Sequence, residues 1–327
     1  GPPRGSARAR ASTRRAGMPG RHPAVVLLSG SGPQDRNEEI MGHRPFLVLA
    51  DYLTRNGFAV LRFDDRGFGK SEGDFSKATN LDFVGDALAA VAWLKSRSEV
   101  DAARIGLAGH SEGGIVAPRA AAQSKDIAFI VLMAGVGVAI GQVLVREAAD
   151  LMRIAGAGEA MIAKQNDLQR ELMRLVRSNG PGPDTQSKVR TLLHESVKEI
   201  SKEHAAALGL SEAVIDAQAT MISSPWFAEI LHYDPVATFA LVRCPVLAVN
   251  GEKDLQVAAG ENLRAIEQAL KKGGNSDVKV VEFAGLNHLF QSCKTGAVSE
   301  YASNEDTFST KALCIITDWL RKRARVM

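Results

Sequence analysis

Short apolar runs alternate with amphipathic stretches along most of the chain. Runs such as residues 25–28 and 245–250 carry almost no polar side chains, which is typical of strands buried on both faces. The expected strands lie near residues 24–29, 58–64, 104–109, 127–134, 244–250 and 278–283. The expected helices lie near residues 45–56, 80–97, 113–124, 259–272 and 307–322. The alternation predicts an α/β fold with a mostly parallel sheet flanked by helices, and ligands bind such sheets beyond the carboxyl ends of the strands.

Between about residues 138 and 235 the pattern changes to helical periodicity, with helices expected near 144–154, 162–176, 189–208 and 213–222. We interpret residues 138–235 as a helical cap inserted into an α/β core of residues 23–137 and 236–327. A cap over a site excludes water and shapes the pocket. Trp226 and Phe227, near the end of this block, are therefore candidate substrate-binding residues, although packing within the cap is an alternative role for them.

Length and composition fit a single enzyme domain with an insertion. The chain has 327 residues, of which 45% are hydrophobic and 24% are charged, as is ordinary for soluble proteins. No apolar run reaches the roughly 18 residues that a membrane span requires, so we expect no membrane association. The three cysteines are widely spaced, which indicates a reducing, cytoplasmic setting without a disulfide framework.

Residues 1–22 differ from the rest of the chain. They contain six arginines and no acidic residue, and they have too little apolar surface to become ordered by burial. We expect a disordered or expression-derived basic tail, with a transit peptide as the alternative. The formal net charge is +3, so residues 23–327 carry −3 once the six arginines are set aside. The folded part therefore lacks the positive excess that binds nucleic acid.

The most informative motif is Gly-His-Ser-Glu-Gly at residues 109–113, between an apolar run and a stretch that can be helical. A sharp strand–turn–helix lifts a serine hydroxyl above the end of a sheet, and small glycines permit the tight turn. Ser111 is therefore the candidate nucleophile. The alternative is a glycine-rich turn with an inert serine.

A serine nucleophile needs a base that takes its proton and an acid that orients the base. In folds with this motif the partners follow in the order serine, acid, histidine. Among the seven histidines, His288 fits because it lies in a small-residue loop directly after the expected strand at 278–283. His110 lies inside the motif and is expected to point away from the hydroxyl.

Asp254 is the candidate acid. It follows the buried strand near 244–250, so its carboxylate is expected at the same sheet edge as Ser111. Glu252 is a weaker rival in the same loop. A loop aspartate that caps the next helix would look similar in the sequence.

An acyl-transfer site also needs donors for the developing oxyanion. The backbone N–H of Glu112, directly after the nucleophile, is one candidate. The other is the N–H of Ser31, in the glycine-rich loop after the strand near 24–29, although an ordinary turn is the alternative. We expect Asp35 and Arg36 to form a local ion pair that fixes this loop.

Together these motifs resemble the α/β-hydrolase superfamily, and within it the bacterial serine esterases of the EstD-like and dienelactone-hydrolase-like groups. The matching segments are residues 29–37, 63–71, 109–114, 251–257 and 286–291. They follow the family order over nearly the whole chain after residue 22. The resemblance implies an α/β-hydrolase fold and hydrolysis of carboxylic esters by a Ser-His-Asp mechanism, with no metal and no organic cofactor.

The chain departs from this family at its N-terminus. The family has two further strands before the strand that leads to the oxyanion loop, and here only residues 1–22 precede that strand. A bare sheet edge recruits other strands. We therefore expect the tail, or a second copy of the chain in a homodimer, to cover this edge.

The sequence thus predicts a carboxylesterase that acts on small esters with short acyl chains. Acyl thioesterase and lactonase activities use the same triad and remain alternatives. A non-catalytic binding module on a hydrolase scaffold is a further alternative, because a fold does not determine a function. The complete triad of Ser111, Asp254 and His288 argues against such a module.

Overall fold

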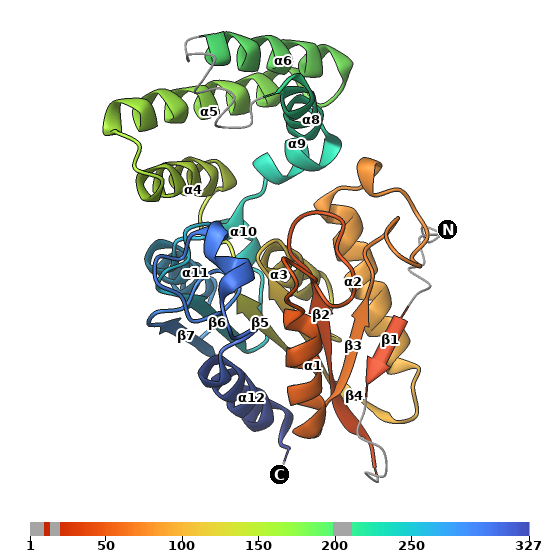
Figure 1. Ribbon diagram of the computed structural model, residues 1–327. Helices are drawn as coiled ribbons and strands as arrows, with labels where there is room; N and C mark the ends of the chain where they lie inside the picture. Colours follow the sequence, from red (N-terminus) through yellow and green to blue (C-terminus); the bar gives the residue numbers. More distant parts are fainter. Residues whose placement is uncertain (1–9, 14–19, 199–210, 327) are drawn as a thin grey trace. The chain divides into compact units, whose positions relative to one another are not determined.

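The structure is a computed structural model that describes residues 10–13, 20–198 and 211–326. A sheet with the strand order β1-β3-β2-β4-β5-β6-β7 lies at its centre (Figure 1). The strands are β1 (Arg10–Thr13), β2 (His22–Leu28), β3 (Ala59–Phe63), β4 (Val100–His110), β5 (Phe129–Met133), β6 (Val246–Gly251) and β7 (Val278–Phe283). β1 runs antiparallel to β3, and all other neighbouring strands are parallel. The prediction of a mostly parallel sheet is confirmed.

Helices cover both faces of this sheet. Alternate residues of one strand enter different cores, because successive side chains point to opposite faces: Val26 belongs to one core and Val25 to the other. The first core also holds residues of α2 (Asn80–Lys95), α3 (Gly113–Gln123), α10 (Pro235–Phe239) and α11 (Ala259–Lys272). The second holds residues of α1 (Pro45–Arg55) and α12 (Thr310–Ala324).

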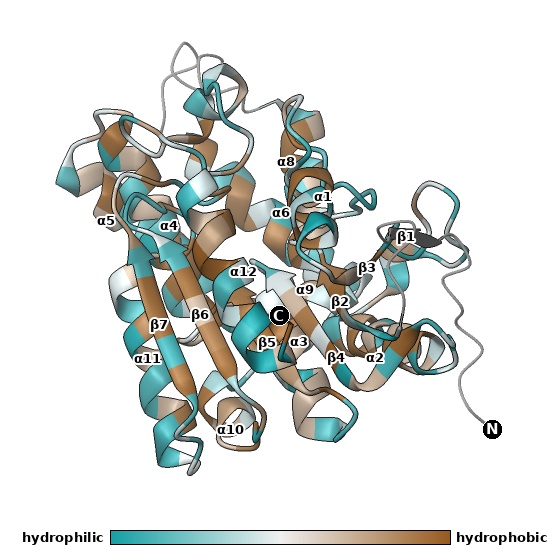
Figure 2. Cartoon of the chain, turned by 90° about the horizontal axis from the view of Figure 1, so that it is seen from below, coloured by the Kyte–Doolittle hydropathy of each residue, from teal (hydrophilic) through white to brown (hydrophobic). Residues whose placement is uncertain are grey.

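Burial on both faces explains the uninterrupted apolar runs in the sequence. All residues of β5 and β6 are buried, and Figure 2 shows β6 mostly in the hydrophobic colour. β7 lies at the edge of the sheet, and only Phe283 of its six residues is buried, so two charged side chains, Lys279 and Glu282, are accommodated there. The expected strands and helices of the core all occur, with bounds within a few residues of those predicted. The short helix α10 and the 3₁₀ turns η1 (Phe75–Lys77) and η2 (Val298–Ser303) were not predicted.

The chain divides into two compact units. The first contains the sheet and comprises the described residues up to Phe75, then Leu81–Val138 and the residues from Asp234 onward. The second comprises Ser76–Asn80 and Ala139–Tyr233. Its helices are α4 (Ile140–Ile154), α5 (Glu159–Asn179), α6 (Pro183–Lys198), α8 (Glu212–Ile222) and α9 (Pro225–Leu231). The interpretation of residues 138–235 as a cap stays a prediction, and the end of the predicted helix at 189–208 lies outside the described residues.

Part of the N-terminal tail is a strand. Residues Arg10–Thr13 pair with Val60–Phe63 of β3 and so occupy the edge at that side of the sheet. The expectation of disorder is therefore wrong for these residues, because backbone pairing can order a segment at an open sheet edge even where its sequence, Arg-Ala-Ser-Thr, has few apolar side chains. The remainder of residues 1–19 lies outside the described part of the chain. Within the described residues, one strand thus precedes β2, which leads to the predicted oxyanion loop.

Candidate active site

Ser111 lies in a strained turn between β4 and α3. Its φ angle is +51°, a left-handed conformation that non-glycine residues adopt rarely and mostly at functional sites. A Cβ atom on Gly109 would lie 2.0 Å from the carbonyl oxygen of Gly113, and one on Gly113 would lie 2.2 Å from that of Leu28. Only glycine fits at these two positions. The strand–turn–helix predicted from the pentapeptide is present, with Ser111 at its apex.

Asp254 and His288 are joined by a buried hydrogen bond. The Nδ1 atom of His288 lies 2.8 Å from Oδ2 of Asp254, and both side chains are almost completely excluded from solvent. The other carboxylate oxygen, Oδ1, accepts from the amides of Gln256 and Val257, each at 2.9 Å. A carboxylate can only accept, so Nδ1 of His288 carries a proton and Nε2 is the basic nitrogen of the neutral ring.

The loop that carries His288 is fixed by its own hydrogen bonds. Oδ1 of Asn287 accepts from the amides of Leu289 and Gln291. The carboxylate of Glu252 accepts from the amide of Gly285 at 2.9 Å. Glu252, the rival acid in the sequence, therefore holds the loop of the histidine and makes no contact with its ring.

The glycine-rich loop after β2 lies beside Ser111. A Cβ atom on Gly30 would be 3.3 Å from the Cβ atom of Ser111, so the next residue, Ser31, is in the neighbourhood that an oxyanion donor must occupy. The loop is anchored to the end of β3 by Asp65, which accepts from the hydroxyl of Ser29 and the amide of Gln34, each at 2.9 Å. Burial raises the pKa of Asp65 to about 7, and the charges of Glu112 and Glu38 add to this effect.

The predicted ion pair between Asp35 and Arg36 is wrong. Asp35 accepts from the amides of Asn37 and Glu39 and so caps its own turn. Arg36 instead forms a bidentate pair with Asp64, at 2.8 and 2.7 Å. The Arg36 guanidinium holds the pKa of Asp64 below its usual value. The glycine-rich loop is therefore anchored to the end of the neighbouring strand through Asp64, a partner distant in sequence, and not by a local pair.

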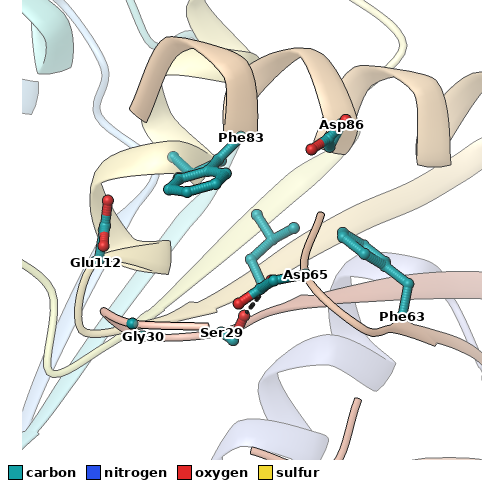
Figure 3. Close-up of a pocket in the computed structure, with 10 residues that line it drawn as sticks. Ser29, Gly30, Phe63, Asp65, Phe83, Asp86 and Glu112 are labelled. Carbon is teal, nitrogen blue, oxygen red and sulfur yellow. Dashed lines mark hydrogen bonds between the residues drawn. The ribbon is translucent and has the colours of Figure 1, made fainter. Parts of the chain in front are cut away.

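A small cavity of about 30 Å³ lies between this loop and α2. At that volume it has room for roughly two water molecules. Figure 3 shows Ser29 directed at Asp65, with Phe83, Asp86 and Glu112 around them. Burial raises the pKa of Asp86, and its pairing with Arg66 opposes this shift. Three carboxyl groups thus share an otherwise mostly apolar lining, and the cavity is too small for an ester substrate.

Trp226 and Phe227 lie in α9, within the helical unit. Phe227 is buried, and the ring centroids of the two residues are 6.2 Å apart. Ser224 caps the helix by accepting from the amide of Phe227 at 3.1 Å. A packing role explains Phe227 within its own unit, and a substrate contact stays a prediction for both residues.

The described residues contain neither a candidate metal site nor a candidate membrane-spanning helix. Within residues 10–13, 20–198 and 211–326, no group of three or more His, Cys, Asp or Glu side chains is arranged to hold a metal ion. Across the same residues, no helix combines the length and apolar character needed to cross a membrane.

Sequence reasoning missed the pairing of Glu38 with His110. The two side chains lie 2.9 Å apart and are buried. Their separation of 72 positions hides the pair in the sequence. His110 itself could have indicated such a pair, because a buried imidazole inside a tight turn needs hydrogen-bond partners for its ring nitrogens.

Comparisons with known proteins agree with this geometry. Residues 44–180 match the family described as "Serine aminopeptidase, S33". Esterase EstD of Thermotoga maritima is 27% identical over 271 residues, which are 83% of this chain but only 55% of EstD, so the chain spans about half the length of that relative. An uncharacterised 31.7 kDa protein of Escherichia coli is 26% identical over 307 residues, covering 92% of this chain and 91% of that protein.

Solved structures show the same fold at low sequence identity. Est1E of Butyrivibrio proteoclasticus, solved with ferulic acid, has a TM-score of 0.54 and 17% identity, covering 96% of this chain and 92% of Est1E. A monoacylglycerol lipase of Paleococcus ferrophilus has a TM-score of 0.52 and 19% identity, covering 96% of this chain and 98% of the lipase. The Pyrococcus furiosus esterase Pf2001 has a TM-score of 0.54 and 17% identity, covering 93% and 83% of the two chains.

Proposed function

We propose that the chain, which has the α/β-hydrolase fold and is similar to Esterase EstD over 83% of its length, is a carboxylesterase acting on short acyl esters. One observation carries the proposal. A buried acid–histidine pair, Asp254 and His288, lies at the carboxyl ends of β6 and β7, and Ser111 occupies the strained turn after β4. Three side chains of these types at one sheet edge match the arrangement that activates a serine for acyl transfer.

In the proposed reaction Ser111 attacks the ester carbonyl through Oγ, and Nε2 of His288 takes the hydroxyl proton. Negative charge develops on the carbonyl oxygen, where the backbone N–H groups of Ser31 and Glu112 would donate. The tetrahedral intermediate collapses as His288 passes the proton to the leaving alcohol. Water, deprotonated by His288, then attacks the acyl-enzyme and releases the acid together with free Ser111.

Asp254 has two tasks in this scheme. It selects the tautomer of His288 that leaves Nε2 free to accept a proton, and it stabilises the imidazolium that forms during each half-reaction. The two amide donors on Oδ1 hold the carboxylate so that Oδ2 faces the ring. The orientation of the base is therefore set before substrate binds, which reduces the reorganisation needed in the transition state.

The family description leaves amide hydrolysis as the second candidate, since residues 44–180 match a family described as a serine aminopeptidase. Thioesters and lactones would be cleaved by the same groups. We propose that the helical unit selects among these substrates, and that Trp226 and Phe227 contribute to the acyl site. A non-catalytic binding module is disfavoured by the intact hydrogen bond between Asp254 and His288.

Hydrolysis of a p-nitrophenyl ester series, from acetate to palmitate, tests the proposal. The wild type should be most active on short chains, and Ser111→Ala should lose activity by roughly 10⁴- to 10⁶-fold. A p-nitroanilide and an acyl thioester measured beside the esters would identify the competing activities. Ester hydrolysis that persists in Ser111→Ala would refute the assignment of the nucleophile.

A further inference from the structure

A second acid–histidine pair lies behind the proposed triad. Oε1 of Glu38 lies 2.9 Å from Nδ1 of His110, and the exposed fractions of the two side chains are 1% and 6%. The same oxygen accepts from the amide of Gly30 at 2.7 Å. On the other side of the ring, Nε2 of His110 lies 3.0 Å from the carbonyl oxygen of His288.

The contacts determine where the protons are. A carbonyl oxygen can only accept, so Nε2 of His110 carries a proton. The proton between Nδ1 and Oε1 belongs to one of these two atoms. The pair is therefore either a carboxylate beside an imidazolium or a carboxylic acid beside a neutral ring. In both forms its net charge is zero, which permits burial next to the charged Asp254–His288 pair.

These three hydrogen bonds join separate segments of the site. Gly30 belongs to the oxyanion loop, His110 precedes the nucleophile, and His288 is the proposed base. Building on the proposed esterase function, we propose that Glu38 and His110 are positioning residues that hold the oxyanion loop and the base at the correct distances from Ser111. Neither side chain touches the reacting atoms in this scheme.

The backbone at Glu38 supports a functional constraint. Its φ angle is +53°, and such a conformation costs a non-glycine residue free energy that the surrounding contacts must offset. The rings of His110 and His288 also lie close together, with centroids 4.7 Å apart. Phe290 closes the cluster, with its ring centroid 6.4 Å from that of His110.

The charges around the pair favour the ionic form. Burial acts to lower the pKa of His110, but the charge and hydrogen bond of Glu38, the carbonyl of His288 and the charge of Asp254 together raise it above its usual value. Asp65 also interacts electrostatically with Glu38. These charges therefore favour the form in which the ring of His110 carries both protons beside the Glu38 carboxylate.

Glu38→Gln tests the pair because an amide cannot satisfy all three contacts at once. If its oxygen takes the place of Oε1, a neutral His110 must put its proton on Nδ1, and the bond to His288 is lost. If its nitrogen takes that place, both ring contacts survive but the amide of Gly30 faces another donor. Only a protonated His110 keeps every bond, and without Glu38 that state loses its buried counter-charge.

The experiment compares the wild type, Glu38→Gln and the control Glu39→Gln on p-nitrophenyl acetate, per mole of folded protein. Glu39 is the neighbouring, half-exposed glutamate paired with Arg44 on the surface. We expect kcat of Glu38→Gln to fall roughly 10- to 100-fold with little change in KM, because displaced catalytic groups affect the transition state more than substrate binding. The control should stay close to wild type.

The pH dependence separates positioning from a merely structural role. Between about pH 8 and about pH 6 the ratio of variant to wild-type kcat should rise as His110 regains its second proton. A ratio that is constant with pH, or a kcat of Glu38→Gln equal to wild type, would overturn the proposal. Repeating the profile with Asp65→Asn in both proteins removes the contribution of Asp65, whose pKa is raised to about 7 and whose charge interacts with Glu38.

A measurement without substrate keeps this test independent of the esterase activity. ¹⁵N NMR of histidine-labelled wild type at pH 7 should show His110 protonated on both nitrogens, assigned by the loss of that signal in His110→Gln. A singly protonated His110 bonded to neither neighbour would overturn the inference even if the protein hydrolyses esters. Doubly protonated His110 in a protein without ester hydrolysis would refute the proposed function and leave the pairing supported.

Discussion

Replacing Asp254 by asparagine should disable the base while leaving the fold in place. Oδ1 of Asp254 accepts two backbone amides, so the side-chain oxygen of asparagine must stay at that position. The amide nitrogen is then directed at Nδ1 of His288, which lies 2.8 Å from the present Oδ2. Two donors cannot face each other, so the ring must move its proton to Nε2 and can no longer accept one from Ser111.

The loss follows from this change of tautomer. We expect kcat to fall by roughly 10⁴-fold, as the same substitution does in a serine-protease triad, which corresponds to about 5 kcal/mol of transition-state stabilisation. The loss of one charge-assisted hydrogen bond should lower the free energy of unfolding by only about 1.5–3 kcal/mol. The protein should therefore remain folded at room temperature while being nearly inactive.

The assay is hydrolysis of p-nitrophenyl acetate, with urea denaturation of the same samples. Glu252→Gln is the matched control, because Glu252 is a carboxylate of the same loop that binds the amide of Gly285 and not the ring. It should lose less than about tenfold in kcat, since the loop alone is affected. An Asp254→Asn protein within tenfold of wild type, or equal losses in both variants, would refute the reasoning.

Three further predictions follow from packing and burial. Gly109→Ala should prevent correct folding or lower the free energy of unfolding by more than about 3 kcal/mol, because its Cβ would lie 2.0 Å from a carbonyl oxygen. The midpoint of urea denaturation, compared with that of the wild type, measures this loss. Asp65 has a folded pKa near 7, above its unfolded value, so it binds a proton more tightly when folded. The contribution of Asp65 to the free energy of unfolding should decline as pH rises from about 4 to about 7, by at most about 1.4 kcal/mol per pH unit. Urea titrations of Asp65→Asn should show a flatter dependence than wild type, and identical slopes would contradict this. Burial raises the pKa of the Cys244 thiol to about 12. Iodoacetamide should therefore alkylate Cys244 in urea and leave it unmodified in the native protein. Alkylation of the native protein at the rate of a free thiol would contradict its burial.

The sequence predicted the parallel sheet and the positions of its helices well because burial on both faces leaves a simple signal. Residues of β5 and β6 are all apolar or small apart from Asn250, and each run has the length of one strand. The triad candidates could be predicted from the sequence for a related reason. Each follows the carboxyl end of a parallel strand, and parallel strands end at one edge of the sheet.

The contacts that stabilise the site could not be predicted in the same way. Arg36 was expected to pair with its neighbour Asp35, but the carboxylate of Asp35 is occupied by backbone amides, and Arg36 pairs with Asp64 at the end of the neighbouring strand β3. Such long-range pairs leave no periodic pattern in one sequence. The tail was expected to cover the open sheet edge, and β1 does so. Its position within the tail could not be predicted, because a four-residue edge strand in an arginine-rich segment has no apolar run to mark it.

The most direct test of the central claim is to find the residue that forms the covalent intermediate. A p-nitrophenyl phosphonate transfers its phosphonyl group to an activated serine, and intact-mass and peptide mass spectrometry locate the adduct. The account predicts one adduct per chain, on Ser111, and none in Ser111→Ala or when His288 is replaced by alanine. An unmodified protein, or an adduct on another residue, would contradict the claim that Asp254 and His288 activate Ser111.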